Sequence, residues 1–223
     1  AVCLGYQMDG LSCFECENYH GMYELVEHLV TEHAVRDVLF VSGPANNQES
    51  ELRLKAMLDV LDKYGIPFSE EQVIPCDWSY HTAQFSLEAW LKQHDRKCPD
   101  AVICANDVMA MGCCATLEEL RIPVPQDVIV TGFDDLVSGY VFSPSLTSVN
   151  PGWDDMTKAA MEHLWKCIDN GNEIIHHVSQ SRMSVKRSCG CTSGNYEDKQ
   201  RKYTFFVGYE RMVYSSYLGW HLC

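Results

Sequence analysis

The sequence predicts an α/β fold built on a doubly wound parallel sheet. Short apolar segments typical of buried strands alternate along most of the chain with longer segments of helical period. Two of the apolar segments, residues 101–104 and 128–130, run directly into polar clusters, which are Asn106-Asp107 and Gly132-Phe133-Asp134-Asp135. In an open α/β sheet, ligands bind beyond the carboxyl ends of the strands. We therefore expect a ligand site at this edge of the sheet.

The first half of the chain contains the start of this alternation. Residues 21–30 are expected to form a helix because their apolar residues recur on one helical face. Residues 38–41, with the sequence VLFV, are typical of a buried strand. Apolar residues at fourfold spacing predict a helix over 51–64, and Gly65 ends it. A short strand over 72–75 and a helix over 82–93 follow.

The second half continues the same pattern. The strand at 101–104 precedes a helix over 108–120, and the strand at 128–130 comes next. An amphipathic helix is expected over 153–168, closed by Asn170-Gly171. Residues 174–178 and 182–186 are interpreted as late strands.

Composition and charge exclude several classes of function for this part of the protein. The 223 residues, 46% of them apolar, suffice for one large domain or two lobes with a sizeable core. The net charge is −14, and the longest basic patch, at residues 199–202, is brief. DNA contact requires clustered Lys and Arg, so DNA is expected only through a module outside this chain. No apolar run has the length of a membrane span, and residues 1–10 lack the pattern of a secretory signal.

The chain contains 12 cysteines. Many stand where a small apolar residue would fit, so reduced cysteines in a cytoplasmic protein are the expectation. We expect no cofactor and no metal. One alternative stays open, in which Cys13-x-x-Cys16 and Cys189-x-Cys191 meet in a four-thiolate zinc site or form a redox disulfide.

Residues 99–150 carry a dense, ordered pattern. It contains PDAVICANDVMAMG, then VPQDVIVTGFDD, then PSLTSV. This segment resembles the effector-binding domain of the lac/gal repressor (LacI/GalR) family, and the resemblance extends over about residues 1 to 191. It implies a periplasmic-binding-protein-like fold of two lobes, with the second lobe nearly complete and the first largely missing. It also implies a homodimer.

The resemblance divides the chain into five parts. Residues 1–35 are expected to be a remnant of the first lobe, 36–149 the second lobe, and 150–177 the return helix of the first lobe. Residues 178–191 are the return strand of the second lobe and its SCGC ending, and 192–223 are a tail of unknown role. The SCGC ending is similar to that of sensor domains placed ahead of an output module, such as an AraC-type, GGDEF-type or histidine kinase domain.

Four residues match ligand positions of the family: Arg53, Trp78, Asn106 and Asp134. A guanidinium fork, an aromatic face, an amide and a carboxylate suit a sugar-like or nucleobase-like ligand. Asp107 and Asp135 are expected to have structural roles near helix starts.

The resemblance therefore implies a small-molecule sensing domain, with a sugar as the expected ligand, in a bacterial transcriptional regulator or signalling receptor. The alternative is the solute-binding protein of a transport system. An enzyme is disfavoured, because the adjacent carboxylates of Asp134 and Asp135 point apart on a strand and cannot converge on a sugar.

Overall fold

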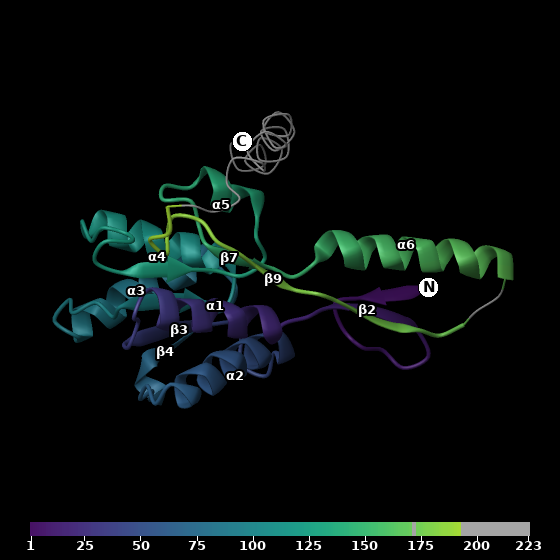
Figure 1. Cartoon of the computed structure of the whole chain (residues 1–223), viewed down its shortest axis with the longest axis horizontal. Helices are drawn as coiled ribbons and strands as arrows, with labels where there is room; N and C mark the ends of the chain where they lie inside the picture. The colour runs from purple at the N-terminus through teal and green to yellow at the C-terminus, as the bar shows by residue number, and fades with distance from the viewer. Residues whose placement is uncertain (171–172, 193–223) are drawn as a thin grey trace, which may run out of the picture.

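The computed structural model describes residues 1–170 and 173–192, which form a larger and a smaller lobe (Figure 1). The expected tail lies almost wholly outside the described residues. The α/β fold with parallel sheets is confirmed. The strands of the larger lobe and its connection are β3 (Val38–Ser42), β4 (Val73–Pro75), β5 (Ala101–Cys104), β6 (Ile129–Thr131), β7 (Ser148–Asn150) and β9 (Arg182–Ser184).

The larger lobe contains a parallel sheet of order β4-β3-β5-β6. Its long helices are α1 (His20–Glu32), α2 (Gln48–Lys63), α3 (Tyr80–Gln93) and α4 (Asp107–Glu119). Helices α1 and α2 pack together on one face, and α3 and α4 pack together on the other (Figure 1). Because both faces are covered, β3 and β5 are buried along their whole length, which explains their continuous apolar sequences. A 3₁₀ turn (Glu70–Gln72) precedes β4, and the short helix α5 (Val137–Val141) follows β6.

The smaller lobe contains a parallel sheet of order β1-β2-β8, built from Val2–Leu4, Ser12–Cys16 and His176–Ser179. Helix α6 (Trp153–Asn170) packs on this sheet. Its apolar core is small and centres on Phe14 and Met156. Strands β1 and β2 were not among the expected elements.

Three segments cross between the lobes, at residues 17–19, 151–152 and 180–181 (Figure 1). Strands β7 and β9 pair antiparallel beside two of these crossings. The larger lobe thus begins earlier than the boundary expected at residue 35, because α1 packs against α2, β7 and β9 rather than on the smaller sheet. Its buried face includes Met22 and Leu25, which belong to the core of the larger lobe. Likewise β8 ends the smaller lobe at Ser179, slightly later than the expected boundary at 177.

Candidate functional site

The four expected ligand residues all lie beyond the carboxyl ends of strands of the larger sheet. Trp78 follows β4, Asn106 follows β5 and Asp134 follows β6, while Arg53 lies on α2, the helix after β3. The start of α2 is fixed by its cap, since Asn47 accepts a hydrogen bond from the Ser50 backbone N–H at 3.0 Å. The Ser50 hydroxyl in turn accepts from the Gly43 N–H at 2.8 Å, which ties the helix to the end of β3.

Arg53 is the centre of the site. Its side chain is buried, and its guanidinium lies 3.7 Å from the Phe133 ring centroid and 5.5 Å from that of Trp78. Nε and Nη2 donate to Oδ1 of Asn18 at 2.9 and 2.6 Å, and Nη1 donates to the Ala105 carbonyl at 2.6 Å. Of five N–H groups, two therefore remain for other acceptors.

Two carboxylates face the remaining Arg53 donors at more than hydrogen-bond distance. Asp134 Oδ1 lies 4.0 Å from Nη1, and Glu49 Oε2 lies 3.8 Å from Nη2. Burial lowers the pKa of Arg53, although Asp134 and Glu49 oppose this effect. Burial also raises the pKa of Asp134 to about 6, because it outweighs the attraction of Arg53. The Arg53 guanidinium and the Asp134 carboxylate are thus neighbours, but they are too far apart to form a hydrogen bond with each other.

The backbone around Asp134 is held in an uncommon conformation. Asp134 has φ +106° and Asp135 has φ +51°, both in the region that side chains rarely adopt. The Asp134 N–H donates to the Val149 carbonyl at 2.9 Å, and the Asp135 N–H donates to the Ser148 hydroxyl at 3.0 Å. These bonds fix the loop from the β7 side.

Asp107 holds the same loop through hydrogen bonds at the start of α4, which agrees with the structural role expected of it. It is fully buried and accepts from the Leu136 N–H at 2.7 Å and the Ser148 hydroxyl at 2.6 Å. Burial raises its pKa to about 8. The side chain of Asp135 is buried, and its Oδ1 pairs with the Nζ of buried Lys186 at 2.6 Å. Both residues hold the loop of residues 132–136 in place through these contacts, in keeping with the structural roles expected of them.

Trp78 packs against Gly43, just after the end of β3. A Cβ added at Gly43 would lie 2.4 Å from the Trp78 ring, so only glycine admits the ring there. Trp78 has φ +70° and remains half-buried, with its ring beside the Arg53 guanidinium. The aromatic face expected from the sequence is therefore next to the polar centre.

Asn106 contributes less hydrogen-bonding capacity than the sequence suggested. Its Oδ1 caps α4 by accepting from the Met109 N–H at 2.8 Å, and its Nδ2 donates weakly to the Trp78 carbonyl at 3.4 Å. One amide hydrogen remains for a ligand. Asn106 therefore positions the start of α4 and the Trp78 loop as well as facing the site.

Sequence reasoning missed three members of this centre: Asn18, Glu49 and Phe133. Asn18 lies on the first crossing between the lobes, where no sequence pattern marks it. Glu49 stands one helical turn before Arg53, a spacing at which side chains meet, so it could have been found. Phe133 lies inside the GFDD segment. It could have been found from the tendency of arginine to stack on aromatic rings, because the expected site already contained Arg53.

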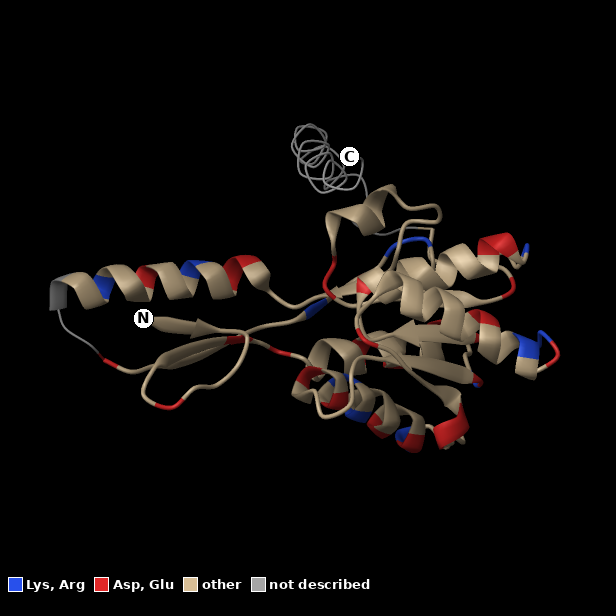
Figure 2. Cartoon of the chain, turned by 180° about the vertical axis from the view of Figure 1, so that it is seen from behind, with Lys and Arg blue, Asp and Glu red and all other residues tan. Residues whose placement is uncertain are grey.

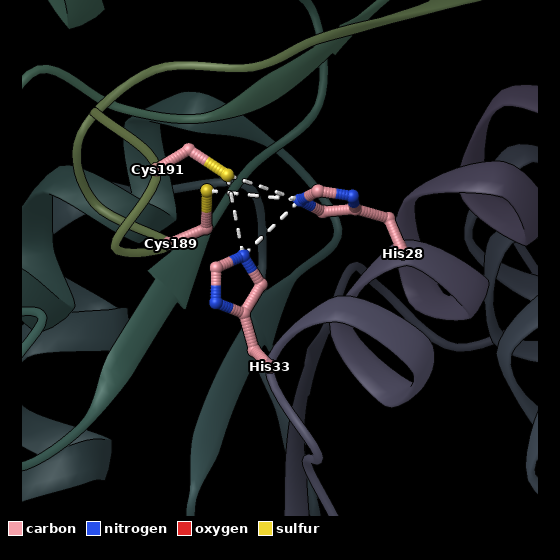
Figure 3. Close-up of side chains that lie close together, drawn as sticks. All are labelled: His28, His33, Cys189 and Cys191. Atoms are coloured by element: carbon pink, nitrogen blue, oxygen red, sulfur yellow. Dashed lines mark hydrogen bonds between the residues drawn. The ribbon is translucent and has the colours of Figure 1, made fainter. Parts of the chain in front are cut away.

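The two cysteine pairs do not meet. The Cys13 sulfur contacts the Met8 and Leu11 carbonyls in the smaller lobe, and the Cys16 sulfur contacts Met156. Cys189 and Cys191 lie instead beside His28 and His33 (Figure 3). The alternative left open by the sequence, in which these two pairs meet in a four-thiolate site, is therefore wrong.

Fold and site together define a two-lobed α/β domain with a polar centre at the junction of its lobes. A family model of the periplasmic binding protein-like domain matches residues 26–189. The chain belongs to this family, in the form found as the effector-binding domain of LacI/GalR regulators.

Known relatives agree with this assignment. The HTH-type transcriptional repressor PurR of Photorhabdus laumondii is 33% identical over 183 residues, which are 82% of this chain and 52% of the repressor. A LacI-family transcriptional regulator from Sanguibacter keddieii is similar in structure, with TM-score 0.76 and 27% identity over 85% of this chain and 72% of that one. A CelR–cellobiose complex has TM-score 0.73 at 24% identity, covering 83% of this chain and 57% of that one, and shows the fold alone.

The chain spans about half the length of the curated PurR relatives that it matches. Among the helices of the described residues, none combines the length and apolarity that crossing a membrane requires.

Proposed function

We propose that this chain is the ligand-sensing part of a bacterial transcriptional regulator or signalling receptor, and that it binds a sugar at the Arg53–Asp134 centre. The 4.0 Å separation of Arg53 Nη1 and Asp134 Oδ1 carries the proposal. A hydroxyl group can accept from the first and donate to the second, with each hydrogen bond about 2.8 Å long. Among the described residues, no hydrogen bond occupies the Asp134 carboxylate.

The surroundings suit a sugar ring. Trp78 offers an apolar face beside the two polar groups, Asn106 retains one amide hydrogen, and Glu49 offers a second acceptor near Arg53. All of these groups lie on the larger lobe, while Asn18 reaches Arg53 from the crossing segment. A ligand that orders Arg53 thereby also engages the segment between the lobes. Closure around the ligand would shift the population of lobe orientations, which an output module can detect.

Isothermal titration calorimetry against monosaccharides, disaccharides and purine nucleobases tests the proposal. We expect one sugar to bind, and Asp134→Asn to weaken its affinity at least about tenfold, since a charge-assisted hydrogen bond contributes about 1.5–3 kcal/mol. The exposed Asp62→Asn on α2 is the matched control and should bind as the parent chain does. Tight binding of a nucleobase with no sugar binding would contradict the sugar assignment, and unchanged affinity in Asp134→Asn would contradict the site.

The charge distribution supports the proposal that this chain binds the ligand while a different module contacts DNA. Lys and Arg are scattered over the described chain among more numerous Asp and Glu residues (Figure 2). A phosphate-binding stripe needs clustered cations. We therefore assign DNA contact to a module outside this chain. The output domain that the SCGC ending suggests would also lie outside it. The relatives named above are transcriptional regulators by name, PurR among them a repressor, and the same role in the cytoplasm, without catalysis, is proposed for this protein.

The dimer proposed from the family resemblance has one supporting surface. Helix α6 exposes Met161, Trp165 and Ile168, spaced so that they share a face away from the smaller sheet. Because the chain is strongly acidic, association through an apolar face is more favourable than through charge. Analytical ultracentrifugation should show a dimer that Trp165→Glu dissociates. A monomer at tens of micromolar concentration would contradict this proposal.

A further inference from the structure

Four side chains from distant parts of the sequence converge at the amino-terminal edge of the larger sheet, away from the ligand site. His28 lies on α1 and His33 caps its end, just before β3 begins. Cys189 and Cys191 lie in the turn after β9. Figure 3 shows both imidazole rings and both sulfur atoms pointing to one common point. Each residue offers one ligand atom, and all four atoms lie within 4.8 Å of one another.

The distances between these atoms match the edges of a small tetrahedron. The two Nε2 atoms are 3.2 Å apart, Cys191 Sγ lies 3.3 and 3.5 Å from those of His33 and His28, and Cys189 Sγ lies 4.0 Å from His28 Nε2. With Zn–N bonds of about 2.0–2.1 Å and Zn–S bonds of about 2.3 Å, tetrahedral edges are about 3.4 Å for N–N and about 3.6 Å for N–S. The cluster is therefore already close to the size that a zinc ion requires.

The surroundings also suit a bound cation. The Thr147 hydroxyl donates to Cys189 Sγ at 3.2 Å, the kind of outer hydrogen bond that orients a metal ligand. Cys189 is fully buried, while the other three residues are half-buried, so the point of convergence is shielded yet reachable. Two nitrogen and two sulfur ligands in a tetrahedron select zinc among the common metal ions.

We propose that His28, His33, Cys189 and Cys191 bind one Zn²⁺ ion in a structural site. All four positions of the tetrahedron are filled by protein atoms, so no open position remains for a substrate. The ion would fasten the SCGC turn, residues 188–191, to α1 and so hold this turn against the larger lobe. This assignment is independent of the ligand proposed above, because no residue is shared with the Arg53–Asp134 centre.

The first test is on the unaltered full chain, purified under reducing conditions without chelator. Metal analysis should find about one zinc per chain. Replacement by Co²⁺ should give the intense visible bands of tetrahedral cobalt and a near-ultraviolet sulfur-to-cobalt charge-transfer band. With metal bound, Cys189 and Cys191 should resist alkylation, as read by peptide mass spectrometry, and a chelator should make them reactive.

Variants locate the site. Cys191→Ser and His33→Ala should each lose zinc, whereas Cys98→Ser and His81→Ala, matched changes outside the cluster, should keep it; circular dichroism verifies that each variant is folded. Four results would each overturn the proposal. Two concern the unaltered chain, which would bind no metal or would give octahedral cobalt spectra. The others are full zinc content in the double variant Cys189→Ser/Cys191→Ser and a Cys189–Cys191 disulfide in the reduced preparation.

Discussion

Replacing Asp134 with asparagine should make the unliganded domain more stable at neutral pH, although the residue is expected to bind the ligand. Asp134 sits in a largely desolvated position, and its side chain is 19% exposed. Burial raises its pKa from 3.8 to about 6, even with Arg53 4.0 Å away. The folded protein therefore resists ionising this carboxyl group, whereas the unfolded chain does not.

The size of the effect follows from the two pKa values. A raised pKa in the folded state means that the group's contribution to stability is fully present below about pH 4 and is lost as the pH rises through about 6. Each pKa unit corresponds to about 1.4 kcal/mol, so the shift sets an upper limit of about 3 kcal/mol. Because Asp134 is partly solvated, we expect its ionisation to lower the free energy of unfolding by about 1–3 kcal/mol at pH 7.5. The amide of Asp134→Asn does not ionise and avoids this loss.

Urea unfolding of the parent chain and Asp134→Asn at pH 4 and pH 7.5 measures this penalty. The two proteins should have nearly the same free energy of unfolding at pH 4, where the parent carboxyl is protonated. At pH 7.5 the variant should be more stable by about 1–3 kcal/mol. Asp62→Asn, on the exposed face of α2, serves as the control and should show no such difference. A variant that is equally stable, or less stable, at pH 7.5 would refute the reasoning.

Two further outcomes follow from the same structure. Ligand affinity should be about tenfold lower at pH 5 than at pH 7, because protonation below about pH 6 removes the Asp134 charge that strengthens the hydrogen bond from the ligand hydroxyl; calorimetry at the two pH values checks this, and equal affinities would count against it. Gly112→Ala should destabilise the fold by about 1–3 kcal/mol, since the new methyl would lie 2.2 Å from the Tyr80 carbonyl oxygen where α3 and α4 touch. An unchanged melting temperature would show that these helices separate easily.

The sequence predicted the larger lobe well because its signals are local. Residues 38–41 and 101–104 are continuously apolar since helices cover both faces of their sheet. Segments after two different strands meet at Arg53, which contacts the Ala105 carbonyl and lies 4.0 Å from Asp134, because parallel strands bring their carboxyl ends to one edge. Arg53 followed only from the family resemblance, as one arginine on a helix carries no pattern of its own.

The remaining features depend on contacts between distant segments. Nothing in the sequence around Asn18 shows that it will receive two hydrogen bonds from Arg53. The side-chain cap that occupies Asn106 Oδ1 competes with its ligand role, and only the geometry shows which use prevails. Spacing could not show that the SCGC cysteines lie beside His28 of α1 and His33 at its end, because the cysteines and the histidines are near opposite ends of the described chain.

The neighbouring carboxylates Asp134 and Asp135 should respond to the same substitution with opposite signs. They lie in the loop after β6 rather than on a strand, and their partners differ: Asp134 Oδ1 is 4.0 Å from Arg53 Nη1, whereas Asp135 Oδ1 is 2.6 Å from the buried Lys186 Nζ. The side chains of this second pair are only 1% and 2% exposed. Asp135→Asn would leave the Lys186 cation buried beside a neutral amide.

Breaking a buried ion pair by removing one partner costs about 3–5 kcal/mol. The Lys186 ammonium keeps its bond to the Leu146 carbonyl at 2.8 Å, which places the expected loss of stability toward the lower end of that range. In the same urea experiment at pH 7.5, Asp135→Asn should therefore be destabilised while Asp134→Asn is stabilised. If both variants move in the same direction, the division of this loop into one ligand-facing and one structural carboxylate is incorrect.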